Sequence, residues 1–251
     1  MIPNRISIVS YNLWNTELWP DREPALRQFL STFMPDILCI QELRNETMIC
    51  VSECLETHEK IKDDLPGWAC ESNIFWNKHY FKEVTHGLED LEMPEKYRGF
   101  FCVRLKVIGS DKTILVATAH FTWQGVPKEI ETGLTPRNHQ IRQTIKCLKK
   151  LVKTNEPAFF MGDLNDPILP LYFLPKEGYN SCFQDLNLLS PTTYPALPMT
   201  DFLGHNLGHN ETIDYIFCNG KAKTISAFVP QFYFKGLAPS DHWPVYAIYQ
   251  L

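Results

Sequence analysis

The sequence predicts one α/β sandwich domain, in which two β-sheets pack face to face and helices cover their outer surfaces. The chain has 251 residues, of which 44% are hydrophobic, a share typical of a protein with a packed core. Short β-branched and aromatic segments recur along its whole length, and amphipathic helical patterns separate only some of them. This order fits neither strict βαβ alternation nor an all-β protein, whereas a two-sheet sandwich uses every element. No stretch has the composition of a linker, so residues 1–251 are predicted to form a single domain.

The expected strands are short apolar runs with the composition that strands have in globular proteins. In chain order they are Ile6–Leu13, Asp36–Glu42, Trp68–Trp76, Phe100–Ile108, Thr113–Phe121, Ala158–Gly162, Thr212–Cys218 and Val245–Leu251. Three helices are expected between them. Pro24–Phe33 has its apolar residues on one face and stops before a proline, and Pro136–Val152 has a similar apolar stripe. Glu46–Leu65 is expected to be the third helix.

Charge and composition limit the class of function. The chain has 24 Lys and Arg against 29 Asp and Glu, and the net charge of −5 argues against bulk binding of nucleic acid or membranes. A local phosphate site remains compatible with that balance. No stretch approaches the ~20 apolar residues of a membrane span, and the first residues lack a secretory signal pattern. With eight scattered cysteines that read as reduced thiols, we expect an intracellular, cytoplasmic protein without stable membrane association.

Acidic, amide and imidazole residues recur where the predicted strands end. Taken one at a time, each has a structural explanation: Glu42 could begin a helix, Asp163 could form an Asx turn, and His120 could be a hydrogen-bonded core residue. Asp214 is harder to explain in this way, because strand interiors disfavour aspartate. Buried carboxylates are costly unless they are paired or bind a metal, so several of them at one edge indicate a site. The full set is Asn12, Gln41, Glu42, His120, Asp163, Asn165, Asp214, Asp241 and His242.

Read together and in order, these residues form a recognisable set of motifs. They are Tyr11-Asn12-Leu13, Gln41-Glu42, Thr118-Ala119-His120, Gly162-Asp163-Leu164-Asn165, Ile213-Asp214-Tyr215-Ile216 and Ser240-Asp241-His242-Trp243-Pro244-Val245. The set resembles the endonuclease/exonuclease/phosphatase superfamily, which has the DNase-I-like fold. The resemblance extends over almost the whole chain, and its most specific parts are the Gly-Asp-x-Asn and Ser-Asp-His-x-Pro-Val motifs.

The resemblance implies a four-layered α/β sandwich of two mixed sheets flanked by helices. It also implies hydrolysis of a phosphoester with Mg²⁺, or Mn²⁺ as its substitute, by in-line attack of an activated water. The metal ligands implied are Glu42, Asn12 and Asp241, and hard oxygen ligands of this kind suit Mg²⁺. The catalytic residues implied are His120, Asp163, Asn165, Asp214 and His242.

Each implied catalytic residue has an expected role. Asp163 would place its carboxylate against the attacking water, while the Asn165 amide donates to a phosphoryl oxygen. His242 would be a base or a phosphate donor, with Asp214 fixing its tautomer. His120 would donate to a non-bridging oxygen or protonate the leaving group. Whether Asp163 or His242 is the base stays open at this point.

The chain departs from the abasic-site endonucleases of the superfamily at two positions. Trp14 stands where those enzymes carry an aspartate, so metal binding would depend more on Glu42 and Asp241. His120 stands where they usually carry tyrosine, and in this respect the chain looks more like the DNase I, sphingomyelinase, deadenylase and tyrosyl-DNA phosphodiesterase branches. Abasic-site repair is therefore not the expected activity.

Substrate contacts are predicted for three further residues. Trp123, soon after His120, could stack on a base, and Arg98 and Arg137 could hold a phosphate, although packing and salt bridges also explain these residue types. We expect a nucleic acid or a nucleotide as the substrate. The alternatives are a lipid or inositol-phosphate phosphodiesterase of the same fold, and a non-catalytic binding or scaffold protein on this fold.

Overall fold

The computed structural model describes residues 5–196 and 210–251, which form two six-stranded sheets. In spatial order the first sheet contains β11 (Lys223–Phe228), β12 (Val245–Gln250), β1 (Arg5–Asn12), β2 (Ile37–Gln41), β4 (Ser72–Asn77) and β3 (His58–Lys60). The second contains β5 (Phe81–Glu89), β6 (Phe100–Val107), β7 (Thr113–His120), β8 (Ala158–Asp163), β10 (Asp214–Cys218) and β9 (Asn180–Ser181). Both sheets are mixed, because β1 is parallel to β2 and β7 is parallel to β8 while the other neighbours are antiparallel.

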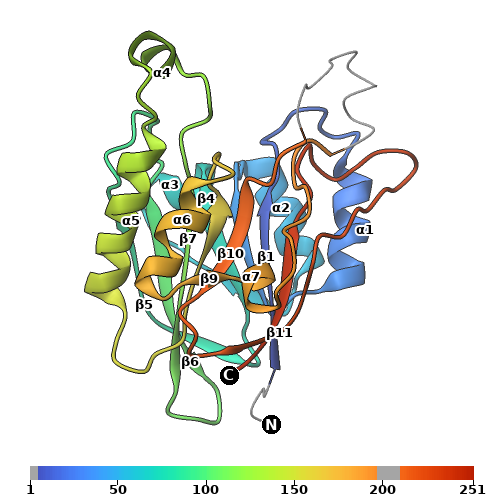
Figure 1. The fold of residues 1–251 in the computed structure, drawn as a ribbon. Coiled ribbons are helices and arrows are strands. Elements are labelled where there is room, and N and C mark those ends of the chain that lie inside the picture. Colours follow the sequence, from blue (N-terminus) through green and yellow to red (C-terminus); the bar gives the residue numbers. More distant parts are fainter. Residues whose placement is uncertain (1–4, 197–209) are drawn as a thin grey trace.

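The longest helices lie on the outer sides of the two sheets, and Figure 1 shows α1 and α5 at opposite sides of the molecule. The helices are α1 (Glu23–Phe33), α2 (Asn45–Cys54), α3 (Gly67–Cys70), α4 (Pro127–Thr132), α5 (Arg137–Leu151), α6 (Leu169–Phe173) and α7 (Cys182–Asp185), with a 3₁₀ turn at Pro175–Glu177. The expected helices over residues 24–33 and 136–152 are confirmed as α1 and α5. Within the ranges that the structure describes, no helix combines the length and the apolar character needed to cross a bilayer.

Three apolar layers hold this arrangement together. The central layer, between the sheets, includes Ile8, Ile74, Val103, Met161 and Ile216. The two outer layers join α1 and α2 to the first sheet and α5 to the second. Full burial of each such side chain is worth about 1.5–3 kcal/mol, so the repeated apolar residues of the strands and helices determine the predicted four-layered sandwich, which the structure confirms.

Two of the expected elements are wrong in part. The helix expected over residues 46–65 ends at Cys54, and His58–Lys60 instead form β3, which pairs with β4. The backbone N–H and C=O of Ile61 are bonded by the Asn73 side chain, so a tertiary partner replaces the helical hydrogen bonds there. The strand expected over 68–76 is divided into α3 and β4, and the strands β5, β9 and β11 were not anticipated.

The two parallel pairs bring the carboxyl ends of β1, β2, β7 and β8 to one edge of the sandwich. At that edge Gly162 lies opposite Ala119, with φ of +145°. A Cβ at Gly162 would lie 1.9 Å from the Ala119 carbonyl oxygen. Glycine is therefore required immediately before Asp163 for β7 and β8 to approach closely.

Replacing Gly162 with alanine is expected to lower the free energy of unfolding by at least about 1–3 kcal/mol, because backbone must move to admit the Cβ. Chemical denaturation measures the effect. The matched control is Gly87→Ala in β5, where an added Cβ would meet only the Cys102 sulfur at 3.8 Å. Equal stability changes in the two variants would contradict the close approach at Gly162.

Candidate active site

Three predicted catalytic residues lie in a row on the second sheet. His120 ends β7, Asp163 ends β8, and Asp214 begins the antiparallel strand β10. The register places His120 opposite Asp163 and Asp163 opposite Asp214, so the three side chains share one face and one edge. Their exposed fractions are 3%, 2% and 1%. Such complete burial of polar groups indicates that they serve one another or a ligand.

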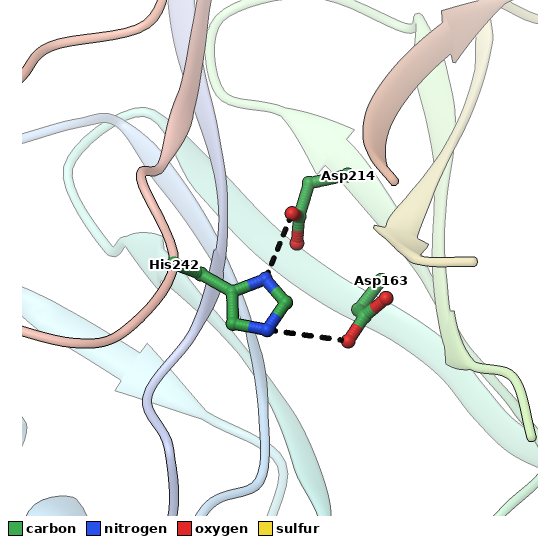
Figure 2. Close-up of side chains that lie close together, drawn as sticks. All are labelled: Asp163, Asp214 and His242. Atoms are coloured by element: carbon green, nitrogen blue, oxygen red, sulfur yellow. Dashed lines mark hydrogen bonds and ion pairs between the residues drawn. The ribbon is translucent and has the colours of Figure 1, made fainter. Parts of the chain in front are cut away.

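His242 reaches this row from the loop before β12 and lies between two of its carboxylates (Figure 2). Its Nδ1 is 2.9 Å from Asp214 Oδ2, and its Nε2 is 3.7 Å from Asp163 Oδ2. Burial opposes a charge on His242, but Asp214, Asp163 and Asp241 outweigh that effect and hold the pKa of the imidazole well above its usual range. Burial also raises the pKa of the Asp214 carboxyl. Both shifts favour retention of a proton within the His242–Asp214 pair.

The first sheet supplies Asn12 and Glu42 from the opposite side. Asn12 ends β1, and its Nδ2 donates to Glu42 Oε1 at 3.2 Å and to Asp163 Oδ2 at 2.9 Å, so this amide connects the two sheets. Glu42 follows β2 with φ of +53°, and Asn15 Nδ2 donates to its other oxygen at 3.1 Å. Burial alone would raise the pKa of Glu42, but His120, His242 and the two amides lower it overall. Glu42 is therefore held as a carboxylate beside Asp163.

Asp241 completes the acidic side of the cluster. Ser240 positions its loop, because the Ser240 hydroxyl donates to the backbone oxygen of Asn12 at 2.7 Å and accepts from His242 N–H at 3.2 Å. Asp241 Oδ1 lies 4.0 Å from His242 Nε2. Burial, reinforced by the negative charge of Glu42 and only partly offset by His242, raises the pKa of Asp241 to about 7. The carboxylates here exceed the positive charge available to them.

His120 has a carboxylate partner that was not predicted. Its Nδ1 lies 2.8 Å from Glu71 Oε1, and Glu71 is in turn 3.1 Å from Arg98 Nε. Nε2 of His120 faces Asp163 Oδ2 at 3.5 Å and Glu42 Oε1 at 3.9 Å. In both His120 and His242, therefore, Nδ1 is hydrogen-bonded to a buried carboxylate and Nε2 faces Asp163. The available signal was that Glu71 is the only acidic residue within the strand expected over 68–76.

Replacing Glu71 with glutamine is expected to lower kcat by on the order of 10²-fold, because His120 loses the carboxylate that fixes its ring. The variant should also reveal a pH-dependent stability. Burial favours the neutral acid, but His120 and Arg98 outweigh it and lower the pKa of Glu71 below its ordinary value of 4.5. Its contribution to stability is then fully present above pH 4.5 and is lost as the pH falls through the lowered pKa.

Unfolding titrations from neutral pH downward measure this difference. The gap in unfolding free energy between wild-type and Glu71→Gln should be widest at neutral pH and should narrow below pH 4.5. A gap that is constant with pH, together with unchanged kcat, would contradict the role of Glu71.

The remaining predicted residues lie at the margin of the cluster. Asn165 accompanies Asp163, to whose Oδ1 it donates its N–H at 3.0 Å, but its side-chain amide donates to the Phe121 carbonyl. Trp123 is 53% exposed and is available to a ligand.

The guanidinium of Arg98 contacts Glu71 and donates to the Phe121 carbonyl. Arg137 is buried, with its guanidinium on three acceptors, Glu129, Asp166 and the Thr122 carbonyl. The structure brings neither arginine to the cluster with a free guanidinium, and the predicted phosphate contacts remain untested.

The donor set suits a hard divalent cation. Asp163, Asp214 and His242 offer ligand atoms within 4.8 Å of one another. However, the two nitrogens of His242 point to different carboxylates, one in a hydrogen bond to Asp214 and one in a longer contact with Asp163, so this trio is not arranged as a chelate (Figure 2). The carboxylates of Glu42 and Asp241, with Asp163 beside them, fit Mg²⁺ or Mn²⁺ better because they are oxygen ligands and carry excess negative charge.

Comparisons with known proteins give one family match and several similar folds. Residues 74–242 match the model of the endonuclease/exonuclease/phosphatase family. No curated protein sequence matches the chain significantly. Among solved structures, a humanised D. rerio TDP2 with 14 mutations is similar at 16% identity and a TM-score of 0.79, covering 99% of this chain and 100% of its own. The mannosyl-6-phosphatase Bt3783 of Bacteroides thetaiotaomicron is similar at 21% identity and a TM-score of 0.77, covering 96% of this chain and 98% of its own.

A third similar structure is D. rerio TDP2 complexed with a single-strand DNA product, at 17% identity and a TM-score of 0.77, covering 98% of this chain and 99% of its own. At these identities the likeness establishes the fold alone. The shared fold is the four-layered DNase-I-like sandwich that the motifs implied, and the matched range contains all the predicted catalytic residues.

Proposed function

The chain belongs to the endonuclease/exonuclease/phosphatase family, and on this premise we propose that it is a Mg²⁺-dependent phosphoester hydrolase in which an activated water attacks phosphorus in line. The observation that carries the proposal is the convergence of two histidine–carboxylate pairs on one aspartate, beside a set of oxygen ligands. Such a site holds proton donors, a proton acceptor and a place for a cation within one small volume, which phosphoester hydrolysis requires.

In this proposal Asp163 orients the attacking water and accepts its proton. Asn12 donates to one Asp163 oxygen and the Asn165 N–H to the other, so the carboxylate cannot turn away from the site. The raised pKa of His242 favours a protonated imidazole, which supports His242 as a donor to a phosphoryl oxygen and Asp163 as the base. His120, held by Glu71, donates to another phosphoryl oxygen or to the leaving oxygen.

We assign the metal to Glu42, with Asn12 and Asp241 as its further ligands. Glu42 is a carboxylate held by two amides, and Asp241 adds a second carboxyl group, whose proton a bound dication would displace. When bound, Mg²⁺ or Mn²⁺ would neutralise charge that develops on the phosphoryl and leaving oxygens. The contacts around Glu42 orient its carboxylate before any cation arrives, which limits the entropic cost of binding.

For the substrate we propose a nucleic acid or a nucleotide. The similar D. rerio TDP2 was solved with a single-strand DNA product, and the exposed Trp123 supplies a surface on which a base can stack. The net charge of −5 favours a locally held substrate over a long stretch of duplex. A sugar phosphate is the second candidate, because the similar Bt3783 is a mannosyl-6-phosphatase.

A substrate panel tests this assignment. Purified protein with Mg²⁺ is incubated with single-stranded DNA, RNA, nucleotides, phosphotyrosyl-DNA, mannose 6-phosphate, an inositol phosphate and sphingomyelin, and kcat/KM is measured for each. The highest value for a nucleic acid or a nucleotide is the expected result. A preference for mannose 6-phosphate would favour the second candidate, and a preference for the inositol phosphate or sphingomyelin would overturn the substrate assignment. No turnover of any member, together with no Mg²⁺ binding, would instead indicate a non-catalytic protein.

A further inference from the structure

Arg22 is a charged residue with 0% of its surface exposed, at the point where α1 begins. A buried guanidinium is costly unless all its donors are satisfied. This guanidinium donates to backbone carbonyl oxygens of two loops that both reach the acidic side of the cluster. Its cost and its position together call for an explanation beyond core packing.

The first loop follows β1. Nη2 of Arg22 donates to the carbonyl oxygens of Leu13 at 3.1 Å, Trp14 at 3.2 Å and Asn15 at 3.4 Å. Trp14 and Asn15 have φ of +53° and +37°, a left-handed conformation that asparagine tolerates but that is unfavourable for a bulky residue such as tryptophan. The guanidinium also lies 5.2 Å from the centre of the Trp14 ring. Arg22 therefore stabilises a turn that the local sequence alone disfavours.

That turn presents two donors to the proposed metal ligands. The Trp14 N–H donates to Asn12 Oδ1 at 2.8 Å, which fixes the orientation of the Asn12 amide. The Asn15 side-chain amide donates to Glu42 Oε2 at 3.1 Å. If the turn relaxed to ordinary φ values, both donors would move, and Asn12 and Glu42 would lose the contacts that orient them.

The second loop precedes β12. Nη1 of Arg22 donates to the Pro239 carbonyl oxygen. The next residue, Ser240, donates from its hydroxyl to the Asn12 carbonyl at 2.7 Å and lies 3.3 Å from Asp241 Oδ1. The same guanidinium therefore fixes the loop that carries Asp241.

We propose that Arg22 is a positioning residue that holds the loops after β1 and before β12 in the one arrangement in which Glu42, Asn12 and Asp241 face a common cation. The inference rests on the proposed metal-dependent hydrolysis. A planar fork of five donors can reach both loops at once, whereas a lysine ammonium in the same place is a single point charge. The role thus requires arginine rather than positive charge alone.

The test is the affinity for Mn²⁺, measured by titration calorimetry on the full-length protein, together with kcat on bis-p-nitrophenyl phosphate. Arg22→Lys and Arg22→Ala are expected to weaken Mn²⁺ binding by about 10–100-fold, as the loss of a group that orients metal ligands does. Added guanidinium ion should restore part of the affinity of Arg22→Ala, whereas the control should bind Mn²⁺ like the wild-type protein with or without it. The control is Arg27→Ala on α1, where the arginine side chain is 38% exposed and paired with Glu23 and Glu53.

A second variant tests the contact between the loop after β1 and Glu42 without removing the buried guanidinium. Asn15→Ala keeps Arg22 and is expected to weaken Mn²⁺ binding in the same direction. If Arg22→Lys folds and binds Mn²⁺ with wild-type affinity, the inference is wrong. If the arginine variants do not fold, wild-type Mn²⁺ affinity in Asn15→Ala overturns it. Absence of Mn²⁺ binding and of hydrolysis in the wild-type protein is a different result, because it rejects the proposed function itself.

Discussion

Replacing His242 with alanine is expected to lower kcat for a phosphodiester by about 10²–10⁴-fold, the range that positioned acid–base groups contribute. His242 lies 2.9 Å from Asp214 and 3.7 Å from Asp163, and these carboxylates raise the pKa of its imidazole. The alanine variant removes the proton donor and leaves Asp214 buried without its partner. Steady-state hydrolysis of bis-p-nitrophenyl phosphate measures the loss.

Two further variants make that result specific to His242. Asp214→Asn keeps the size of the partner and removes its charge, so it should also lower kcat, since the ring loses its fixed tautomer. His139→Ala is the control, because His139 lies on α5 with its side chain 52% exposed and paired with Glu92. If His242→Ala folds normally and retains the activity of His139→Ala, the proposed role of His242 is wrong.

Replacing Glu42 with glutamine is the second change with a large expected effect. The lowered pKa of Glu42 keeps it ionised at neutral pH, and the amide would remove this charge from the proposed metal ligands. A glutamine amide would also place a donor against the Asn12 or Asn15 amide, which both donate to this side chain. We expect activity at limiting Mg²⁺ to fall by about 10–100-fold or more, with partial recovery at high Mg²⁺.

The measurement is initial rate against Mg²⁺ concentration for wild-type, Glu42→Gln and the control Glu46→Gln. Glu46 is exposed in the first turn of α2, only four residues away in sequence. A shift of the Mg²⁺ dependence in Glu42→Gln alone would support Glu42 as a ligand. Identical curves for all three proteins would remove Glu42 from the metal site.

The residues of the second-sheet row were accessible to prediction because each directly follows, precedes or interrupts an apolar strand. His120, Asp163 and Asp214 are such residues. The parallel strands β7 and β8 bring their carboxyl ends, with His120 and Asp163, to one edge, and the antiparallel strand β10 begins there with Asp214. What the sequence does not encode locally is the register that sets His120 opposite Asp163, since it depends on the packing of β7 against β8. The family motifs supplied that link.

Glu71 and the two arginines show which contacts residue type and spacing do not reveal. The partner of His120 comes from the segment before β4, 49 residues away, and only the folded chain brings them together. Arg98 and Arg137 have the residue type of phosphate ligands, but their guanidinium groups are bound to internal acceptors, Glu71 and Glu129 among them. Residue type alone does not indicate which acceptors an arginine side chain contacts in the folded chain.

The error over residues 46–65 has a similar cause. Ile61 has the spacing of a helical apolar residue, yet its backbone hydrogen bonds go to Asn73, and the preceding residues pair with β4. Edge-strand pairing with a distant segment outweighed a weak local helical pattern. The periodic helices α1 and α5 were predicted correctly because their apolar faces cover whole sheets.

The most direct test of metal-dependent phosphoester hydrolysis at this site is the rate of bis-p-nitrophenyl phosphate hydrolysis by the wild-type protein before and after EDTA, and again after Mg²⁺ is added back. We predict that EDTA abolishes hydrolysis by the wild-type protein and that Mg²⁺ restores it. The Asp163→Ala variant should show no hydrolysis under any of the three conditions. Hydrolysis that persists in EDTA, or an Asp163→Ala variant as active as the wild-type protein, would contradict the assignment.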